Sequence, residues 1–347
     1  MSANIRETRF CIGFHKQAAL QTALAAADCW SLMKTNPQLF TVNLLAENNG
    51  AWIGKDDEFP TANYLTNWDV SGPLEGFLTS EKAALLAAFG LGKAVKSVAG
   101  SGFLYTCTPL PPVTDEIEMP AVTIVEAIRQ GASDVFDRAL VGMCLEEFGF
   151  QINSGPGLQS ARLTSQWVGC GKTVSPSTIS VPAVTTEHLL PAYSAALTVI
   201  GTNYVSAKTI QSAEFRWKNN LRLDTGFFPG SGSNGGAQIR GRMEHGDRQC
   251  TFNVVARFAN GSTELDNFLA QTEGTAVLSL TGAEISTGVN HSLVLTLHRL
   301  VIRSAVVGDA DGIVTVATEF LPMTHAVDGL VKIEVTCAKD EILTAAA

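Results

Sequence analysis

The stretch Ile210-Gln-Ser-Ala-Glu-Phe-Arg-Trp-Lys-Asn-Asn-Leu221 carries the clearest indication of the fold class. Apolar and polar side chains alternate along its centre, which is the period of a β-strand with one buried face. Similar short runs, separated by Gly, Asn, Asp and Pro, recur along the chain and predict a mainly β protein. The clearest predicted strands are 41–45, 102–108, 121–128, 141–152, 161–168, 195–200, 210–217, 249–258, 276–280, 292–303, 313–321 and 330–337.

Few segments have the features of helices. The run 80–89 begins with a possible cap, Ser80, and stops at Gly90, which predicts a short helix. The run 263–271 has acidic residues in its first turn and predicts a second. A third segment, 17–32, is rich in Ala and has helix propensity, although it has no apolar stripe.

The composition narrows the class of protein. The 347 residues are 46% hydrophobic and only 16% charged, which excludes disorder, and no apolar run reaches the length of a membrane span. The N-terminus lacks the apolar core of a signal peptide, so we expect a soluble protein made in the cytoplasm. A net charge of -9 argues against a protein that grips nucleic acid. The seven scattered cysteines are interpreted as buried hydrophobes in a reducing compartment.

No motif in the sequence predicts catalysis, a cofactor or a metal. The segment 230–235 spells G-x-G-x-x-G, but a β-like run follows it instead of a helix, so it is interpreted as the tip of a hairpin. The six histidines lie on different predicted elements, without metal or triad spacing, and are interpreted as ordinary surface or interface residues. We therefore predict no catalytic, cofactor-binding or metal-binding residues.

The chain contains two series of features in the same order. Asn48-Asn49 and Asn219-Asn220 each lead through a polar loop with Phe-Pro to a strand and then a short helix. A later strand in each series places an acidic residue beside Phe, at Glu147 and at Glu319. This order predicts two related halves, 1–172 and 195–347, joined by a Ser/Thr/Pro-rich linker at 173–194. Chance similarity between two β domains is the alternative.

The 210–221 stretch also resembles a segment of the tail tube proteins of long-tailed bacteriophages. The resemblance continues through a Gly-rich loop, the run Ile239-Arg-Gly-Arg-Met-Glu244, a β-rich segment at 250–258 and the short helix. The segment Asn67-Trp-Asp-Val-Ser-Gly-Pro-Leu-Glu-Gly-Phe-Leu78, followed by a helix, is similar to the same element in a duplicated tube protein. The resemblance covers most of residues 40–337.

The family resemblance implies a fold and a role. The fold would be a β-sandwich or open barrel with a short flanking helix, duplicated in this chain. Subunits would close into rings that stack head to tail into a hollow tube, which DNA crosses during ejection. A ring would hold three duplicated chains with pseudo-sixfold symmetry, or six chains. The partners would be further copies and other tail proteins, with no membrane, and the protein would be a virion tail component assembled in the host cytoplasm.

Two long loops, 48–63 and 224–240, are expected to reach the next ring, because aromatic residues in polar loops otherwise need an explanation. The candidate contact residues are Trp52, Ile53, Asp56, Asp57 and Phe59 in the first loop, and Phe227, Phe228 and Arg240 in the second. The alternative is a loop folded back on its own core.

An acidic inner surface would repel phosphates and let DNA slide. The candidates for the lumen are the strand residues Glu146, Glu147, Glu214 and Glu319. Ordinary solvated positions are the alternative.

Two other classes of function stay open at this point. One is a carbohydrate- or receptor-binding β-sandwich module of a virion, which would gather aromatic residues on one exposed face. The other is an enzyme on a double β-sandwich, which would need a pocket with perturbed acids and bases. The sequence also does not separate a tail tube protein from a terminator or cap protein of the same tail fold.

Overall fold

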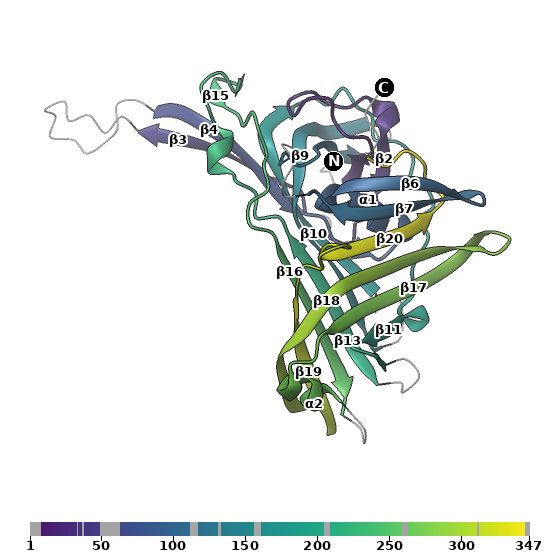
Figure 1. Ribbon diagram of the computed structural model, residues 1–347. Coiled ribbons are helices and arrows are strands. Elements are labelled where there is room, and N and C mark those ends of the chain that lie inside the picture. Colours follow the sequence, from purple (N-terminus) through teal and green to yellow (C-terminus); the bar gives the residue numbers. More distant parts are fainter. Residues whose placement is uncertain are drawn as a thin grey trace, which may run out of the picture.

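A computed structural model describes residues 8–32, 34–36, 38–48, 63–111, 117–130, 133–155, 161–204, 209–258, 263–310 and 312–343. It confirms the prediction of a mainly β fold with two short α-helices (Figure 1). The strands are β1 (Thr8–Gly13), β2 (Cys29–Leu32), β3 (Thr41–Asn48), β4 (Asn63–Pro73), β5 (Gly76–Phe77), β6 (Gly92–Ala99), β7 (Gly102–Pro109), β8 (Val122–Gln130), β9 (Ser133–Asn153), β10 (Ala161–Val174), β11 (Ala196–Val199), β12 (Thr202–Asn203), β13 (Ile210–Lys218), β14 (Ser233–Asn234), β15 (Ala237–Gln238), β16 (Gln249–Arg257), β17 (Gly274–Ser286), β18 (Val289–Ala310), β19 (Ile313–Pro322) and β20 (Val331–Cys337); the α-helices are α1 (Ser80–Leu91) and α2 (Glu264–Ala270).

The main sheet is open and antiparallel. Its order is β3-β4-β10-β9-β13-β16-β19-β18, so strands from both ends of the chain share one sheet. Within the described residues no pairing joins β3 to β18, and these two strands form its edges. The sheet is therefore not closed into a barrel.

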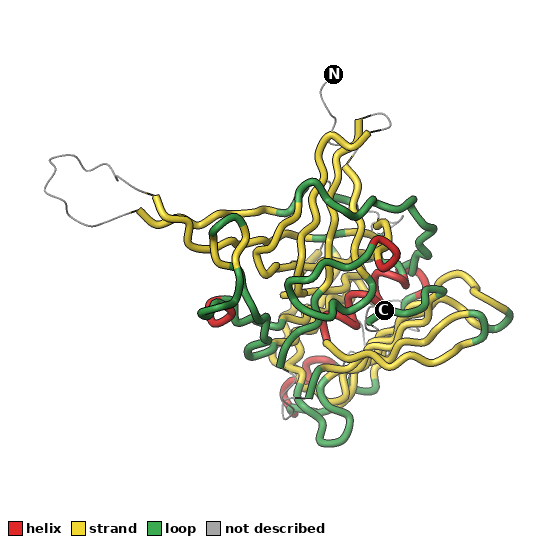
Figure 2. Tube along the Cα trace, turned by 90° about the horizontal axis from the view of Figure 1, so that it is seen from above, coloured by secondary structure: helices red, strands yellow, loops and turns green. Residues whose placement is uncertain are grey.

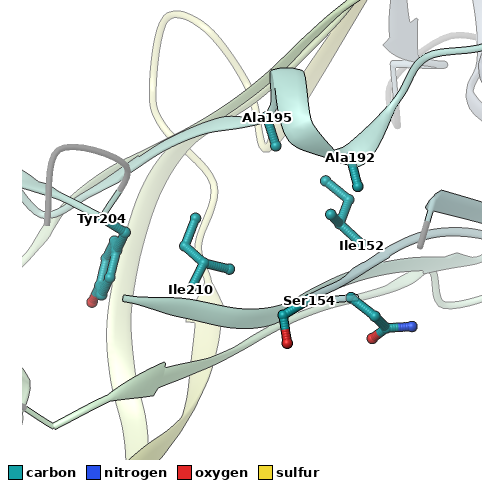
Figure 3. Close-up of a pocket in the computed structure, with 7 residues that line it drawn as sticks. Ile152, Ser154, Ala192, Ala195, Tyr204 and Ile210 are labelled. Carbon is teal, nitrogen blue, oxygen red and sulfur yellow. The ribbon is translucent and has the colours of Figure 1, made fainter. Parts of the chain in front are cut away.

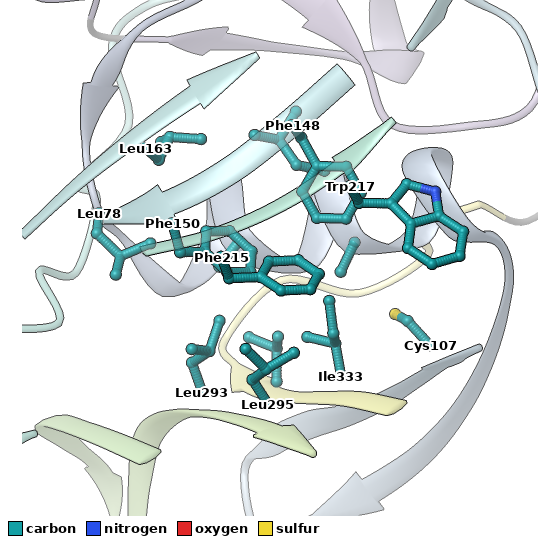
Figure 4. Close-up of a cluster of buried hydrophobic side chains, with 14 of the residues drawn as sticks. Leu78, Cys107, Phe148, Phe150, Leu163, Phe215, Trp217, Leu293, Leu295 and Ile333 are labelled. Atoms are coloured by element: carbon teal, nitrogen blue, oxygen red, sulfur yellow. The ribbon is translucent and has the colours of Figure 1, made fainter. Parts of the chain in front are cut away.

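Two long strands leave the main sheet and enter a second layer. The first part of β18 pairs with β17 and β20, and this layer continues through β7 to β6. The first part of β9 similarly pairs with β8, which pairs with β1. The two layers enclose a common core, in which aromatic residues of β9 and β13 face aliphatic residues of β18 and β20 (Figure 4).

The helix α1 lies inside this core. Every one of its residues is buried, and it packs against β20, β7 and β9. It begins where the Thr79 hydroxyl accepts the N–H of Lys82, one residue before the expected cap, and it ends at Gly92, whose φ of 86° favours glycine. A helix that is apolar nearly all round is stable only when it is covered on all sides, as α1 is.

One strand pair joins the N-terminal part of the sheet to the C-terminal part. Seven residue pairs connect β9 to β13, from Asn153–Ser212 to Glu147–Lys218. The rings of Phe148, Phe150 and Phe215 lie 5.7–5.9 Å apart across this junction. Aromatic cross-strand pairs of this kind stabilise a sheet beyond their buried area.

A buried asparagine closes the same junction. Asn219 follows β13 and is fully buried. Its amide nitrogen donates to the carbonyl oxygens of Gly90 and Leu145, both at 2.9 Å, and its oxygen accepts the indole N–H of Trp217 at 2.9 Å. One side chain therefore ties the end of α1 to β9 and β13.

The pairing pattern occurs twice along the chain. The series β1, β2, β3, β4, α1, β8, β9, β10 is followed by β11, β12, β13, β16, α2, β17, β18, β19. In both series the first strand pairs with the second and with the fifth, which is β8 or β17, and the remaining strands pair in the same order. In the first series β6 and β7 come between α1 and β8. Glu147 lies on β9, the seventh element of the first series, whereas Glu319 lies on β19, the eighth element of the second.

The expected helix at 17–32 is also wrong. This segment forms turns, a three-residue 3₁₀ turn at Ala26–Asp28 and then β2. The N–H of Gln17 donates to the carbonyl of Ala121, its amide donates to the hydroxyl of Thr123, and β2 pairs with β1. Tertiary pairing therefore overrides the intrinsic propensity of the alanines.

We expect Asn219→Ala to lower the free energy of unfolding by about 3 kcal/mol, because it leaves two carbonyls and one indole N–H buried without this partner. Urea unfolding followed by tryptophan fluorescence measures the change. Gln249→Ala, at an exposed position of neighbouring β16, is the matched control and should change stability by less than about 0.5 kcal/mol. An equally small effect of both substitutions would contradict the role given to Asn219.

Candidate assembly surfaces

A two-stranded arm extends from one edge of the main sheet. Strands β3 and β4 continue well beyond the body of the molecule, as Figures 1 and 2 show. The side chains of Leu44, Leu45 and Leu65 are exposed on this arm. Exposed apolar residues at a sheet edge are typical of a surface that another chain covers.

The opposite edge also exposes apolar residues. Val306 and Val307 on β18 are 61% and 47% exposed, and Val314 on β19 is exposed beside them. The nearby helix α2 exposes Leu269. Both edges of the main sheet therefore present apolar side chains beside a strand whose outer side pairs with no other described strand.

Three of the four predicted lumen residues share one face of the sheet. Glu147, Glu214 and Glu319 alternate with buried aromatic residues of β9, β13 and β19, so all three point away from the core. The Arg216 guanidinium lies between two of them, 2.6 Å from Glu214 and 3.5 Å from Glu147, and Arg303 lies 3.2 Å from Glu319. The face is polar with mixed charge, because these carboxylates are paired.

The fourth residue, Glu146, has a different environment. It is the extra residue of a β-bulge in β9, and its carboxylate accepts the N–H of Leu221 at 2.8 Å. Burial raises its pKa, and the Leu221 hydrogen bond partly opposes this. Glu146 therefore positions the loop after β13.

The loop 224–240 folds back onto the body of its own chain, which was the alternative for this segment. Its hairpin β14–β15 turns at Gly235 and Gly236, both with positive φ, so the G-x-G-x-x-G segment forms a hairpin tip as predicted. The indole N–H of Trp68 donates to the carbonyl of Asn234, and Gln238 pairs with Asn67 of β4. The loop is thus fixed against the base of the β3–β4 arm.

The predicted contact residues of this loop lie at different depths. Arg240 is buried, donates to the carbonyls of Leu223 and Gly169, and forms an ion pair with Asp69 at 3.1 Å. Its guanidinium lies over the Phe227 ring, whereas Phe228 is 40% exposed. The other candidates, Trp52, Ile53, Asp56, Asp57 and Phe59, lie outside the described residues.

Two hollows mark the surface of the described chain. One, of about 270 Å³, lies beside the end of β9 and is lined by Ile152, Asn153, Ser154, Ala192, Ala195, Tyr204 and Ile210 (Figure 3). The other, of about 340 Å³, lies on the mixed-charge face and includes Glu75, Glu147 and Arg216. In the second lining the Ser165 hydroxyl donates to the carbonyl of Leu74 and accepts the indole N–H of Trp167.

A polar cluster that the sequence did not predict joins α1 to the linker and to β18. The rings of His188 and His291 stack at 3.9 Å, with Glu81 within hydrogen-bonding distance of His188 at 2.5 Å. Ser80 bonds His291 at 2.8 Å. Ligand atoms of Glu81, His188 and His291 lie within 4.8 Å of one another, which could admit a metal ion. The two rings lie nearly parallel, and in this structure the cluster forms a hydrogen-bonded contact between α1, the linker and β18.

A buried ion pair lies on the same helix. The Lys82 ammonium is 2.5 Å from the carboxylate of Glu187, and both side chains are almost fully buried. Glu187 belongs to the predicted linker, which runs along the body with Ile179, Val181 and Leu190 buried. The linker is therefore part of the folded structure.

These features define a class of protein: an open-sheet structural subunit with apolar edges, a projecting arm and a polar sheet face. Comparison with known families assigns it more closely. The family model described as phage tail tube protein matches residues 47–336, and the chain belongs to this family. It is a structural component of the virion tail. A comparison with curated proteins gives no match.

The helices of the described residues include none that is both long and apolar enough to cross a lipid bilayer.

We expect Lys82→Met to lower the free energy of unfolding by about 3–5 kcal/mol, because it removes the ammonium group that lies against the buried Glu187 carboxylate. Combining it with Glu187→Leu should recover most of this loss, which a double-mutant cycle would measure. The exposed pair Arg299–Glu273 is the matched control, and its removal should cost less than about 1 kcal/mol. Equal costs for the two pairs would contradict the account.

We also expect acid to destabilise the fold through His291. Burial lowers the pKa of this imidazole, and the neighbouring His188 lowers it further, against an opposing effect of Glu81. The unfolded chain, whose histidine titrates near 6.5, therefore binds the proton more readily. The free energy of unfolding should fall as the pH drops below about 6.5, and His291→Gln should make this fall shallower. Denaturant unfolding at several pH values tests this, and identical slopes for both proteins would refute it.

Proposed function

We propose that this chain is the repeating, ring-forming subunit of the tail tube of a long-tailed phage, with three chains in each ring. Its two halves, 1–172 and 195–347, would be duplicated copies of one tube fold, joined by the linker 173–194. The observation that carries this proposal is the repeated strand order with its identical pairings.

A shared irregularity supports the correspondence. In the first series, β9 has one extra residue, Glu146, where it pairs with β10. In the second series, β18 has one extra residue, Arg303, where it pairs with β19. The residue after each bulge partner is a buried aromatic, Trp167 on β10 and Phe320 on β19. Bulges are retained features of a fold, so matching positions favour duplication over chance.

The ring size follows from the duplication. The β9–β13 pair already joins two tube-like units side by side in one sheet. The family resemblance implies six units around a ring, and two units per chain then require three chains. The symmetry of such a ring is threefold for chains and pseudo-sixfold for units.

The mixed-charge face of the main sheet is proposed to line the lumen. Its carboxylates Glu147, Glu214 and Glu319 are spaced by Arg216 and Arg303, so the face offers no continuous basic patch to hold phosphates. A passing DNA molecule would therefore slide along it during ejection.

Stacking of rings is assigned to the ends of the sheet. The β3–β4 arm projects from the body of the chain, and Trp52 and Phe59 belong to the segment between its two strands. Phe228 is exposed near the base of the arm, and Arg240 would act indirectly by holding the loop 224–240 in place. Head-to-tail contacts that do not close generate a filament, which is the form of a tube. The chain would assemble in the host cytoplasm and meet other tail proteins at the tube ends.

The proposal is tested by purifying the chain and imaging it in negative stain over a concentration series. We expect hollow rings with threefold symmetry that stack into tubes, and native mass spectrometry should give rings of three times the 36.8 kDa chain mass. Rings with six times the chain mass would reject the three-chain arrangement. Monomers at every concentration would reject the tube function itself.

A further inference from the structure

The two free edges of the main sheet correspond to the two strands of its internal junction. β18 holds the place of β9, and β3 holds the place of β13. At the internal junction Phe148 and Phe150 are fully covered, whereas Val306 and Val307, near the equivalent positions of β18, are exposed. The exposed positions therefore lack the strand that covers their counterparts.

The registers within the chain give the register expected between β18 and a strand that would cover it. Aligning the bulges Glu146 and Arg303 makes Ser304 equivalent to Glu147, Ala305 to Phe148 and Val306 to Gly149.

The other edge is aligned through the strands next to it. Gly72 pairs with Trp167, and Phe252 pairs with Phe320, so β4 and β16 align at these residues. The partner of Ser71 is Thr41, and the partner of Thr251 is Arg216. Thr41 is therefore equivalent to Arg216, Val42 to Trp217 and Asn43 to Lys218.

We infer that the ring closes by antiparallel pairing of β18 of one chain with β3 of the next copy, with Val306 opposite Thr41, Ala305 opposite Val42 and Ser304 opposite Asn43. This register repeats the internal pairs Gly149–Arg216, Phe148–Trp217 and Glu147–Lys218. The inference rests on the proposed ring and names its contact. Pairing of two unpaired edges satisfies their backbone groups and covers their apolar side chains.

The pairing between the two chains would end at Thr41, because the backbone groups of the preceding residue, Phe40, are already hydrogen-bonded within the chain. The N–H of Phe40 donates to Glu126 at 2.6 Å, and its carbonyl accepts from Arg138 at 2.5 Å. A carboxylate and a guanidinium thus stand where the carbonyl and N–H of a neighbouring strand would be. Since both groups of one strand residue point to the same edge, Val42 presents its groups to the partner and Thr41 lies at a position where the Cα atoms are close.

The test is a disulfide cross-link in assembled rings. Val306→Cys combined with Thr41→Cys places two thiols at a close antiparallel pair, which is within reach of a disulfide. Under a mild oxidant we expect covalent dimers and trimers on non-reducing gels and no larger species within one ring. Gln151→Cys with Glu214→Cys, at an existing pair of the internal junction, is the positive control and should cross-link within one chain. Val306→Cys with Asn43→Cys is the control for a shifted register.

The native cysteines interfere little, because all but Cys250 are buried, and the unmodified protein is the blank.

A charge pair gives a second readout that needs no oxidation. Val306→Lys with Thr41→Lys should prevent ring formation while circular dichroism stays unchanged, and Val306→Lys with Thr41→Glu should restore rings.

The outcomes separate the two claims. Rings that form normally without cross-links, or that cross-link equally in the shifted register, would overturn the pairing and leave the tube function standing. Rings that tolerate the Lys/Lys pair would also overturn it. Failure of the unmodified chain to form rings would instead count against the tube function.

Discussion

The pairing of β9 with β13 is the constraint on which the rest of this structure depends. It joins strands from the two parts of the chain and sets them in one register. The aromatic rings of Phe148, Phe150 and Phe215 fill the space behind it, and Asn219 fixes the end of α1 to it. Without this junction the main sheet would divide into two smaller sheets, each with an additional unpaired edge.

The same junction explains why the outer edges of the main sheet have no neighbouring strand among the described residues. If the two halves repeat one fold and are joined through β9 and β13, the outer edges of the sheet must be the strands equivalent to these two, which are β18 and β3. Natural monomers protect such edges with charge, bulges or covering segments. Here Glu126 and Arg138 cover only the position at Phe40, while the valines of β18 remain exposed. These features suit a subunit of the tail tube family.

Much of the fold could be predicted from sequence, because alternation reports directly on a half-buried strand. The run at 210–217 forms β13, and the helices at 80–89 and 263–271 form α1 and α2, each within a few residues. The segment 17–32 misled because helix propensity is local, whereas its hydrogen bonds to Thr123 and Ala121 come from distant residues.

The surfaces were less predictable, for a related reason. Arg240 reads as an exposed loop residue, and only the folded chain brings Asp69 and Gly169 to its guanidinium. His188 and His291 stack although they lie on separate elements, so spacing could not indicate them. The order of features in the two halves was visible in the sequence. The bulges at Glu146 and Arg303, on which the proposed alignment of the two halves rests, could be found only from the strand registers.

The most direct measurement is hydrogen–deuterium exchange of the free chain and of assembled rings. In the free chain, amides at the β9–β13 junction should already be protected, whereas those of Val42 and Ala305 should exchange rapidly. Assembly should protect both edges together. If assembly instead left Val42 and Ala305 unprotected and protected other segments, the account of a sheet that repeats its internal junction between chains would be wrong.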